Sequence, residues 1–284
     1  MGIGSEETEK MRTKAPRNQG QYYYRDQLSL QGQWIYDILE ARCRQKDYRN
    51  QIQFRIKQFN TFMKDVCRAY QALRDDHPEY FYLGSQYRII TRGLEGILEY
   101  RRLYHPDMID RITLQLRRRI CQLVRGTAYH TLEEQERMVY QRIAKMLTYD
   151  HQHGDCDHNV VGPILYRSGV CEGYNAMLLL CFRRLGIPCV KAFGKMSEER
   201  TTWHCWTKLW LAEQEYHCDV TWDSGISGQV PFRYFNLNEK QIRKDHVLAF
   251  FDEEGNLCIN PSSEIQGGRT GFEYAPVPAI CERP

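Results

Sequence analysis

The sequence has 284 residues, of which 42% are hydrophobic and 26% are charged. The chain is therefore long enough to bury one sizeable core. Its 39 Lys and Arg against 36 Asp and Glu give a net charge of +3, too close to balance to predict nucleic acid or an anionic membrane as a partner. No apolar run approaches the roughly 18–20 residues of a membrane span, and the first residues lack the apolar segment of a secretory signal. We therefore expect a soluble cytoplasmic protein.

The 11 cysteines are odd in number, and no two are spaced as C-x-x-C. The absence of C-x-x-C pairs excludes the commonest zinc and redox motifs. Without an export signal, reduced thiols are expected, most of them as small core residues. We expect no bound metal and no cofactor.

The first part of the chain predicts a flexible lead-in over residues 1–27, followed by a smaller α+β region over 28–127. Apolar spacing predicts helices at about 33–46 and 61–74, and the latter ends before His77-Pro78 because proline disfavours helical geometry in the residue before it. Alternation of Ile52, Phe54 and Ile56 predicts a half-buried strand, and two further strands are expected at about 82–91 and 96–104.

Two more helices are expected at about 106–126 and 131–147. Thr131 and Glu134 are spaced as a capping box at the start of the second. We place a boundary near residue 128, a core over 128–250 and a C-terminal extension packing on it over 251–284. Arg117, Arg118 and Arg119 spread around a helix, so we interpret them as a solvated face, not a nucleic-acid site.

The segment His151–His158 is dense in potential metal ligands, with three histidines, a cysteine and two aspartates. Their spacing matches no standard structural zinc site. A polar or site-lining loop is the favoured interpretation, and a zinc site is the alternative.

A helix buried on nearly all sides is predicted to begin at Cys171. The residues from Ala176 to Leu185 are apolar around most of the circumference, with Gly186 as C-terminal cap and Pro188 blocking continuation. At a helix start, unpaired backbone amides and the helix dipole stabilise a thiolate. Cys171 is therefore a candidate nucleophile, although a buried, inert cysteine is the ordinary alternative.

Two aromatic-rich segments, 203–210 and 216–223, are separated at hairpin distance and predict two antiparallel strands. His204 and Asp219 are then nearly opposite each other on one face, close enough for a carboxylate to orient an imidazole. Alternation puts Cys205 and Cys218 on the other face, which predicts core cysteines and not nucleophiles. His217 is a second candidate base, ranked lower because it lies beside the turn.

These residues resemble the transglutaminase-like superfamily. The similar blocks are Gly169-Val170-Cys171-Glu172-Gly173-Tyr174, His204-Cys205-Trp206 and Asp219-Val220-Thr221-Trp222-Asp223, with a weaker likeness through Lys244-Asp245-His246. The resemblance implies an α+β, papain-like core in which the cysteine helix packs on an antiparallel sheet. It also implies a triad of Cys171, His204 and Asp219. Cys205 departs from the pattern, since alanine is common there, and its outward position predicts no catalytic part.

The expected function is cysteine-dependent acyl transfer on a peptide or protein amide, as a protease, deamidase or transglutaminase, with hydrolysis favoured. A non-catalytic peptide- or protein-binding module with the same fold is the alternative. The sequence leaves the substrate, the acyl acceptor and the oligomeric state open.

Overall fold

A computed structural model describes residues 17–55, 59–196, 203–225, 229–251 and 257–259 of the chain. Helices and strands both contribute substantially, and the fold is of the α+β class. The α-helices are α1 (Leu30–Arg44), α2 (Phe59–Asp76), α3 (Pro106–Val124), α4 (Leu132–Met146), α5 (Val161–Leu165), α6 (Cys171–Arg184) and α7 (Glu239–Ile242). Short 3-10 turns are η1 (Arg17–Gly20), η2 (Arg25–Gln27) and η3 (Gly154–Cys156). No helix in the described ranges has the length and apolar character needed to cross a membrane.

The strands form three sheets. The first is antiparallel with the order β1-β3-β2, from β1 (Gln51–Arg55), β2 (Leu83–Arg92) and β3 (Glu95–Arg102). The second is antiparallel with the order β10-β9-β6-β7-β8, from β6 (Cys189–Lys195), β7 (Trp203–Leu211), β8 (Gln214–Cys218), β9 (Val247–Phe251) and β10 (Leu257–Ile259). A short parallel pair joins β4 (Thr148–Tyr149) to β5 (Ser168–Gly169).

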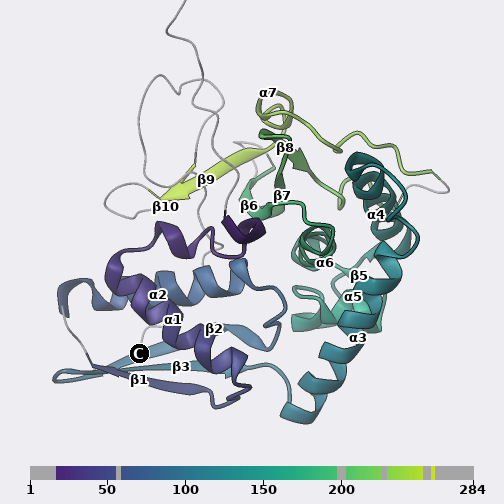
Figure 1. Ribbon diagram of the computed structural model, residues 1–284. Helices are drawn as coiled ribbons and strands as arrows, with labels where there is room; N and C mark the ends of the chain where they lie inside the picture. The colour runs from purple at the N-terminus through teal and green to yellow at the C-terminus, as the bar shows by residue number, and fades with distance from the viewer. Residues whose placement is uncertain (1–16, 56–58, 197–202, 226–228, 252–256, 260–284) are drawn as a thin grey trace, which may run out of the picture.

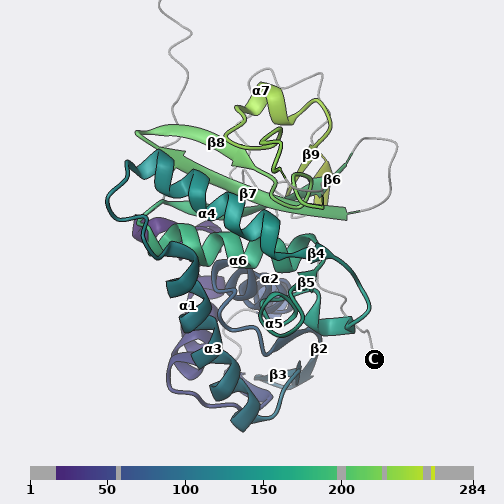
Figure 2. The same cartoon turned by 90° about the vertical axis from the view of Figure 1, so that its right-hand side faces the viewer.

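Helix α6 lies at the centre of the molecule (Figures 1 and 2). It packs against β6 and β7 on one side and against α3, α4 and α5 on others. Residues such as Met177, Leu178 and Phe182 are fully buried, which confirms the predicted burial of this helix. Gly186 takes a φ of 83° just after the helix, a conformation that glycine adopts without strain. The helix is therefore a fixed support for whatever lies at its first residue.

Helices α1 and α2 cover one face of the β1–β3 sheet (Figure 1). Burial along β1 alternates, with Ile52 and Phe54 facing the helices, and Phe54 contacts Phe62 of α2 with ring centroids 6.2 Å apart. The predicted helices and strands of this region are confirmed, and α2 ends at Asp76, immediately before His77. Ile56 lies outside the described residues.

Residues 17–27 are docked, which corrects the expectation of a flexible lead-in for this part of it. The backbone N–H groups of Tyr24 and Arg25 donate to the buried Asp76 carboxylate, both at 3.0 Å. The buried Arg183 guanidinium donates to the carbonyls of Asp76, at 2.5 Å, and of Gly20 and Cys189, both at 3.2 Å. Composition alone could not predict this, because the partners lie more than 50 residues away.

One local prediction at α4, the capping box, is confirmed. The Thr131 hydroxyl accepts from the Glu134 backbone at 3.3 Å, while the Glu134 carboxylate accepts from the Thr131 backbone at 2.8 Å. Arg117 and Arg118 are exposed on α3 and Arg119 is half-buried, and the interpretation of these arginines as a solvated face stays a prediction. One continuous set of buried side chains joins the N-terminal layer, which consists of α1, α2 and the β1-β3-β2 sheet, to α6 and the five-stranded sheet. The boundary near residue 128 stays a prediction.

Candidate active site

Cys171 is the first residue of α6, and its side chain is half-buried. The residue before it, Val170, provides no side chain to cap the helix, so the first backbone amides remain available to a negative charge. Gly173 lets the preceding loop approach closely, because a Cβ there would meet the Asp157 carbonyl oxygen at 2.8 Å. Local sequence therefore places the thiol at the positive end of a rigid helix.

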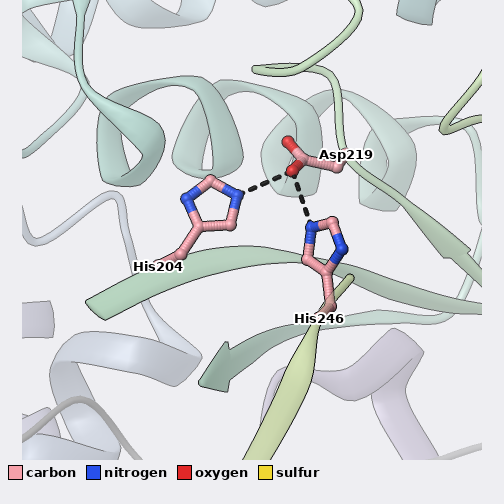
Figure 3. Close-up of side chains that lie close together, drawn as sticks. All are labelled: His204, Asp219 and His246. Carbon is pink, nitrogen blue, oxygen red and sulfur yellow. Dashed lines mark hydrogen bonds and ion pairs between the residues drawn. The ribbon is translucent and has the colours of Figure 1, made fainter. Parts of the chain in front are cut away.

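His204 and Asp219 are in direct contact. His204 Nε2 lies 2.6 Å from Asp219 Oδ2, and both side chains are buried (Figure 3). The other carboxylate oxygen, Oδ1, accepts from the backbone N–H groups of Thr221 at 3.0 Å and Trp222 at 3.3 Å. These bonds fix the carboxylate and occupy Nε2 of the imidazole, which leaves Nδ1 for the Cys171 thiol.

The hairpin that carries the two residues differs in register from the expectation. β7 and β8 are joined by a two-residue turn at Ala212 and Glu213, and their pairing ends at Thr207 opposite Cys218. Asp219 follows the last strand residue and lies in a turn, not in a strand opposite His204. Alternation still brings the two side chains to one face, because the shift in register is an even number of residues.

His246 is a third member of the site, and it precedes β9. Its Nε2 lies 3.1 Å from the same Asp219 oxygen, and its Nδ1 lies 2.7 Å from the Asp245 carboxylate. The ring is fully buried between Trp222 and Trp206, with centroids at 4.5 and 4.7 Å. From the sequence, His246 was named only in the weaker part of the family resemblance. Its position next to Asp219 was not predicted, because the place of β9 in the sheet was not known.

The charges of the site are strongly shifted. The pKa of Cys171 is lowered well below its ordinary value, chiefly by a hydrogen bond from Cys205 and then by contact with His204, against the effect of burial. The pKa of His204 is raised to about 10, because the Asp219 charge and the Cys171 contact outweigh burial. The pKa of Asp219 is lowered by both histidines despite burial. At neutral pH the arrangement therefore favours a thiolate beside an imidazolium.

Cys171 packs against the buried group that contains Cys205, a proximity that the sequence analysis did not predict. The burial of Cys205 in the core is as predicted, with Phe193 and Ala249 around it. Burial raises the pKa of the Cys205 thiol. Strand alternation places Cys205 and His204 on opposite faces of β7. It does not predict that the start of α6 lies close to both residues.

His217 has its own set of partners. The indole N–H of Trp206 donates to its Nδ1 at 3.0 Å, and its Nε2 lies 2.9 Å from Glu239. The imidazole is fully buried, and burial lowers its pKa. These contacts give it a structural place apart from Cys171, as its lower rank in the sequence analysis predicts.

The segment His151–His158 forms a loop around η3. His153 stacks on Tyr166 with centroids 4.0 Å apart and contacts Asp157, whereas His158 Nδ1 lies 2.7 Å from Glu172. Within the described residues, the grouping of three possible metal ligands is instead His204, Asp219 and His246, whose ligand atoms lie within 4.8 Å of one another. Both imidazoles are hydrogen-bonded to the carboxylate in that grouping, so we assign it no metal.

A cleft of about 540 Å³ opens beside the start of α6. One wall comes from the N-terminal layer, with Arg74, Phe81 and Gln86, and the other comes from the core, with Glu172 and Trp203. Across its floor Lys191 Nζ lies 3.0 Å from Asp75 and 3.2 Å from Glu172. Glu172, the residue after Cys171, lines the cleft, whereas Cys171 is not among its lining residues.

Comparison with protein families defines the class of this core. Residues 118–221 match the model of the transglutaminase-like superfamily, a range that includes Cys171, His204 and Asp219. Over these residues the chain is therefore similar to the transglutaminase-like superfamily. A comparison with curated proteins returned no match.

Three solved structures show partial similarity. One is a TGase, with 15% identity, a TM-score of 0.35 and coverage of 50% of this chain and 45% of that one. The second, a putative cysteine protease from Cytophaga hutchinsonii, has 15% identity, a TM-score of 0.32 and coverage of 38% and 37%. The third, the periplasmic domain of TgpA from Pseudomonas aeruginosa, has 18% identity, a TM-score of 0.33 and coverage of 46% and 56%. The chain thus spans about half or less of each.

Proposed function

We propose that this protein is a cysteine-dependent acyl-transfer enzyme acting on peptide or protein amide bonds, with Cys171, His204 and Asp219 as its catalytic triad. The observation that carries the proposal is that His204, whose Nε2 lies 2.6 Å from Asp219, also lowers the pKa of the Cys171 thiol, so that the three groups form a chain. A structural cysteine needs no such chain. An activated one needs a base, and the base needs a group that orients it.

The first half of the reaction follows from the charges. The Cys171 thiolate attacks the amide carbonyl carbon, and the carbonyl oxygen becomes an oxyanion next to the backbone N–H groups at the start of α6. His204, already protonated, gives its proton to the leaving amine as the C–N bond breaks. Asp219 holds the imidazole in position and stabilises its charge. An acyl-thioester on Cys171 and a free amine remain.

The second half returns the enzyme. A water molecule gives a proton to the now neutral His204 and attacks the thioester carbonyl, and the C–S bond breaks to release a carboxylic acid and the thiolate. A primary amine in place of water would give cross-linking. We favour water because it needs no binding site of its own. The cleft beside Glu172 and Trp203 is the proposed binding place for the peptide.

The test is iodoacetamide labelling of each cysteine in the native protein between pH 5 and 9, with His204→Ala as the comparison. We expect Cys171 to label first in the wild type, and much more slowly in the variant at the acidic end. A peptide library with and without an added primary amine then identifies substrate and acceptor. Slow labelling of Cys171 that is independent of His204 would overturn the proposal in favour of a non-catalytic binding module.

A further inference from the structure

The start of α6 and the first residues of β7 hold two thiols together. Cys171 packs against the buried group of Phe193, Cys205 and Ala249, and Cys205 is the largest cause of the lowered pKa of the Cys171 thiol. One helical turn after Cys171, the Asn175 amide donates to the Thr207 hydroxyl at 2.8 Å. Thr207 lies two residues after Cys205 and therefore on the same face of β7. This hydrogen bond fixes the position of α6 along β7, and with it the position of Cys171 relative to Cys205.

The two thiols differ in access and in charge. Cys171 is half-buried, whereas Cys205 is only 1% exposed. The pKa of Cys171 is lowered and that of Cys205 is raised, so at neutral pH a thiolate faces a thiol. Oxidants react with thiolates that they can reach. A small oxidant therefore meets Cys171 first, and the oxidised sulfur then has a thiol at its side.

We propose that Cys205 is a resolving cysteine, which converts a peroxide-oxidised Cys171 into a reversible Cys171–Cys205 disulfide. The inference rests on the proposed function in taking Cys171 as the reactive thiolate, and it adds a modification site and a regulation of that site. Cys171 already packs against the group that contains Cys205, and forming the disulfide brings the two sulfur atoms to about 2.0 Å by side-chain rotation.

The oxidant is hydrogen peroxide, and the atoms balance in two steps. The Cys171 thiolate attacks one peroxide oxygen, the O–O bond breaks, and with one proton the products are a sulfenic acid and water. The Cys205 thiol then attacks the sulfenic sulfur, the S–O bond breaks, and the Cys205 proton leaves with the oxygen as a second water. A dithiol reductant regenerates both thiols. Without Cys205, further peroxide takes the sulfenic acid to sulfinic acid, which a dithiol does not reduce.

The experiment treats the full native chain with hydrogen peroxide, blocks free thiols with iodoacetamide, and maps the peptides by mass spectrometry. We expect a peptide joining Cys171 to Cys205, and full recovery of Cys171 labelling after dithiothreitol. Cys205→Ser keeps a hydrogen-bond donor but has no sulfur, so it should give no joined peptide and a loss of labelling that dithiothreitol does not reverse. Cys121→Ser removes an exposed cysteine on α3 and should behave as the wild type.

Wild-type Cys171 ending as sulfinic acid, or joined to another cysteine while Cys205 stays free, would overturn the inference. Thermal unfolding of each variant shows whether it is folded. The joined peptide is detected without any activity assay, so the two proposals fail separately. A Cys171–Cys205 disulfide together with His204-independent labelling would leave the inference standing and remove the triad.

Discussion

His204 and His217 lie on the two strands of one hairpin, and each contacts one carboxylate. The distances are 2.6 Å from His204 to Asp219 and 2.9 Å from His217 to Glu239, and both rings are buried. Their pKa values nevertheless move in opposite directions, up to about 10 for His204 and down for His217. A buried histidine with an acidic partner is therefore not enough to define a catalytic base.

The difference lies in the second nitrogen and in the partner. Trp206 donates to His217 Nδ1, and a nitrogen that accepts a hydrogen bond cannot also carry a proton. The Glu239 side chain is 40% exposed, so water screens its attraction for a charged His217. The positive charge of Lys208 lowers the pKa of His217 further. His204 instead has a fully buried carboxylate on one side and the thiolate on the other. It is held charged, whereas His217 is held neutral.

The largest expected effect comes from replacing each histidine by alanine. His204→Ala should lower kcat by about 10⁶-fold, because the proton donor to the leaving amine is lost. His217→Ala should cost about 1–3 kcal/mol of stability, because the Trp206 N–H loses its partner, while Cys171 labelling keeps its pH dependence. The assays are peptide hydrolysis and thermal unfolding. Equal losses of activity in two equally folded variants would erase the distinction.

Asp219→Asn tests the source of the charge on His204. Without the carboxylate, the pKa of His204 should fall from about 10 towards its ordinary value, and kcat should fall by roughly 10²–10⁴-fold. Activity needs the imidazolium, so the wild-type rate should decline as the pH rises through about 10, and in the variant this decline should begin at lower pH. The pH profile of kcat/KM measures it.

The matched control is Asp223→Asn. Asp223 is also buried beside the site, but it accepts from Tyr140 at 2.6 Å and from the Arg233 and Tyr234 backbones at 3.0 Å. Its loss should lower the free energy of unfolding and leave the alkaline limb in place. A shift of that limb in Asp223→Asn as large as in Asp219→Asn would contradict the assignment.

His246 is expected to act as a positioning residue. His246→Leu removes one charge-assisted hydrogen bond to Asp219, worth about 1.5 kcal/mol, which corresponds to roughly a tenfold fall in kcat with little change in KM. His246→Gln retains an N–H donor and should recover part of the rate. Comparing the two variants in kcat and in the pH profile separates positioning from simple packing, which glutamine would not rescue.

The smallest effect concerns stability in acid. The folded protein resists protonation of His217, while the unfolded chain takes the proton near its ordinary pKa of about 6.5. The free energy of unfolding should therefore decline from this source as the pH falls below about 6.5. In His217→Gln that component should be absent, and denaturant titrations at pH 7 and 5.5 would measure it. A slope unchanged by the substitution would show that His217 is not held neutral.

The parts of this site that could be predicted from sequence are those fixed by neighbours in the chain. The start of α6 at Cys171, its termination ahead of Gly186 and the Thr131–Glu134 capping box depend on residues within a few positions of each other. The pairing of His204 with Asp219 depends on one hairpin, and even an incorrect register kept them on the same face.

Contacts between distant segments could not be predicted in this way. The hairpin was predicted between residues 210 and 216, but its two-residue turn was not, because Ala212 and Glu213, with φ of 46° and 62°, stand where Asn-Gly is usual. Cys205 meets Cys171 because α6 crosses the start of β7, and His246 reaches Asp219 because β9 joins the sheet beside β6. These contacts depend on how the helices and strands pack against one another, which the periodicity of the sequence does not specify.

Gly194 has a consequence for the spacing of the site. It pairs with Leu248 where β6 meets β9, and a Cβ there would lie 1.9 Å from the Val247 carbonyl oxygen. Any side chain at this position must push away the strand that follows His246, and with it the second imidazole on Asp219. The distance between β6 and β9 therefore depends on the absence of a side-chain methyl group at Gly194. The alignment of His246 with Asp219 depends on it in turn.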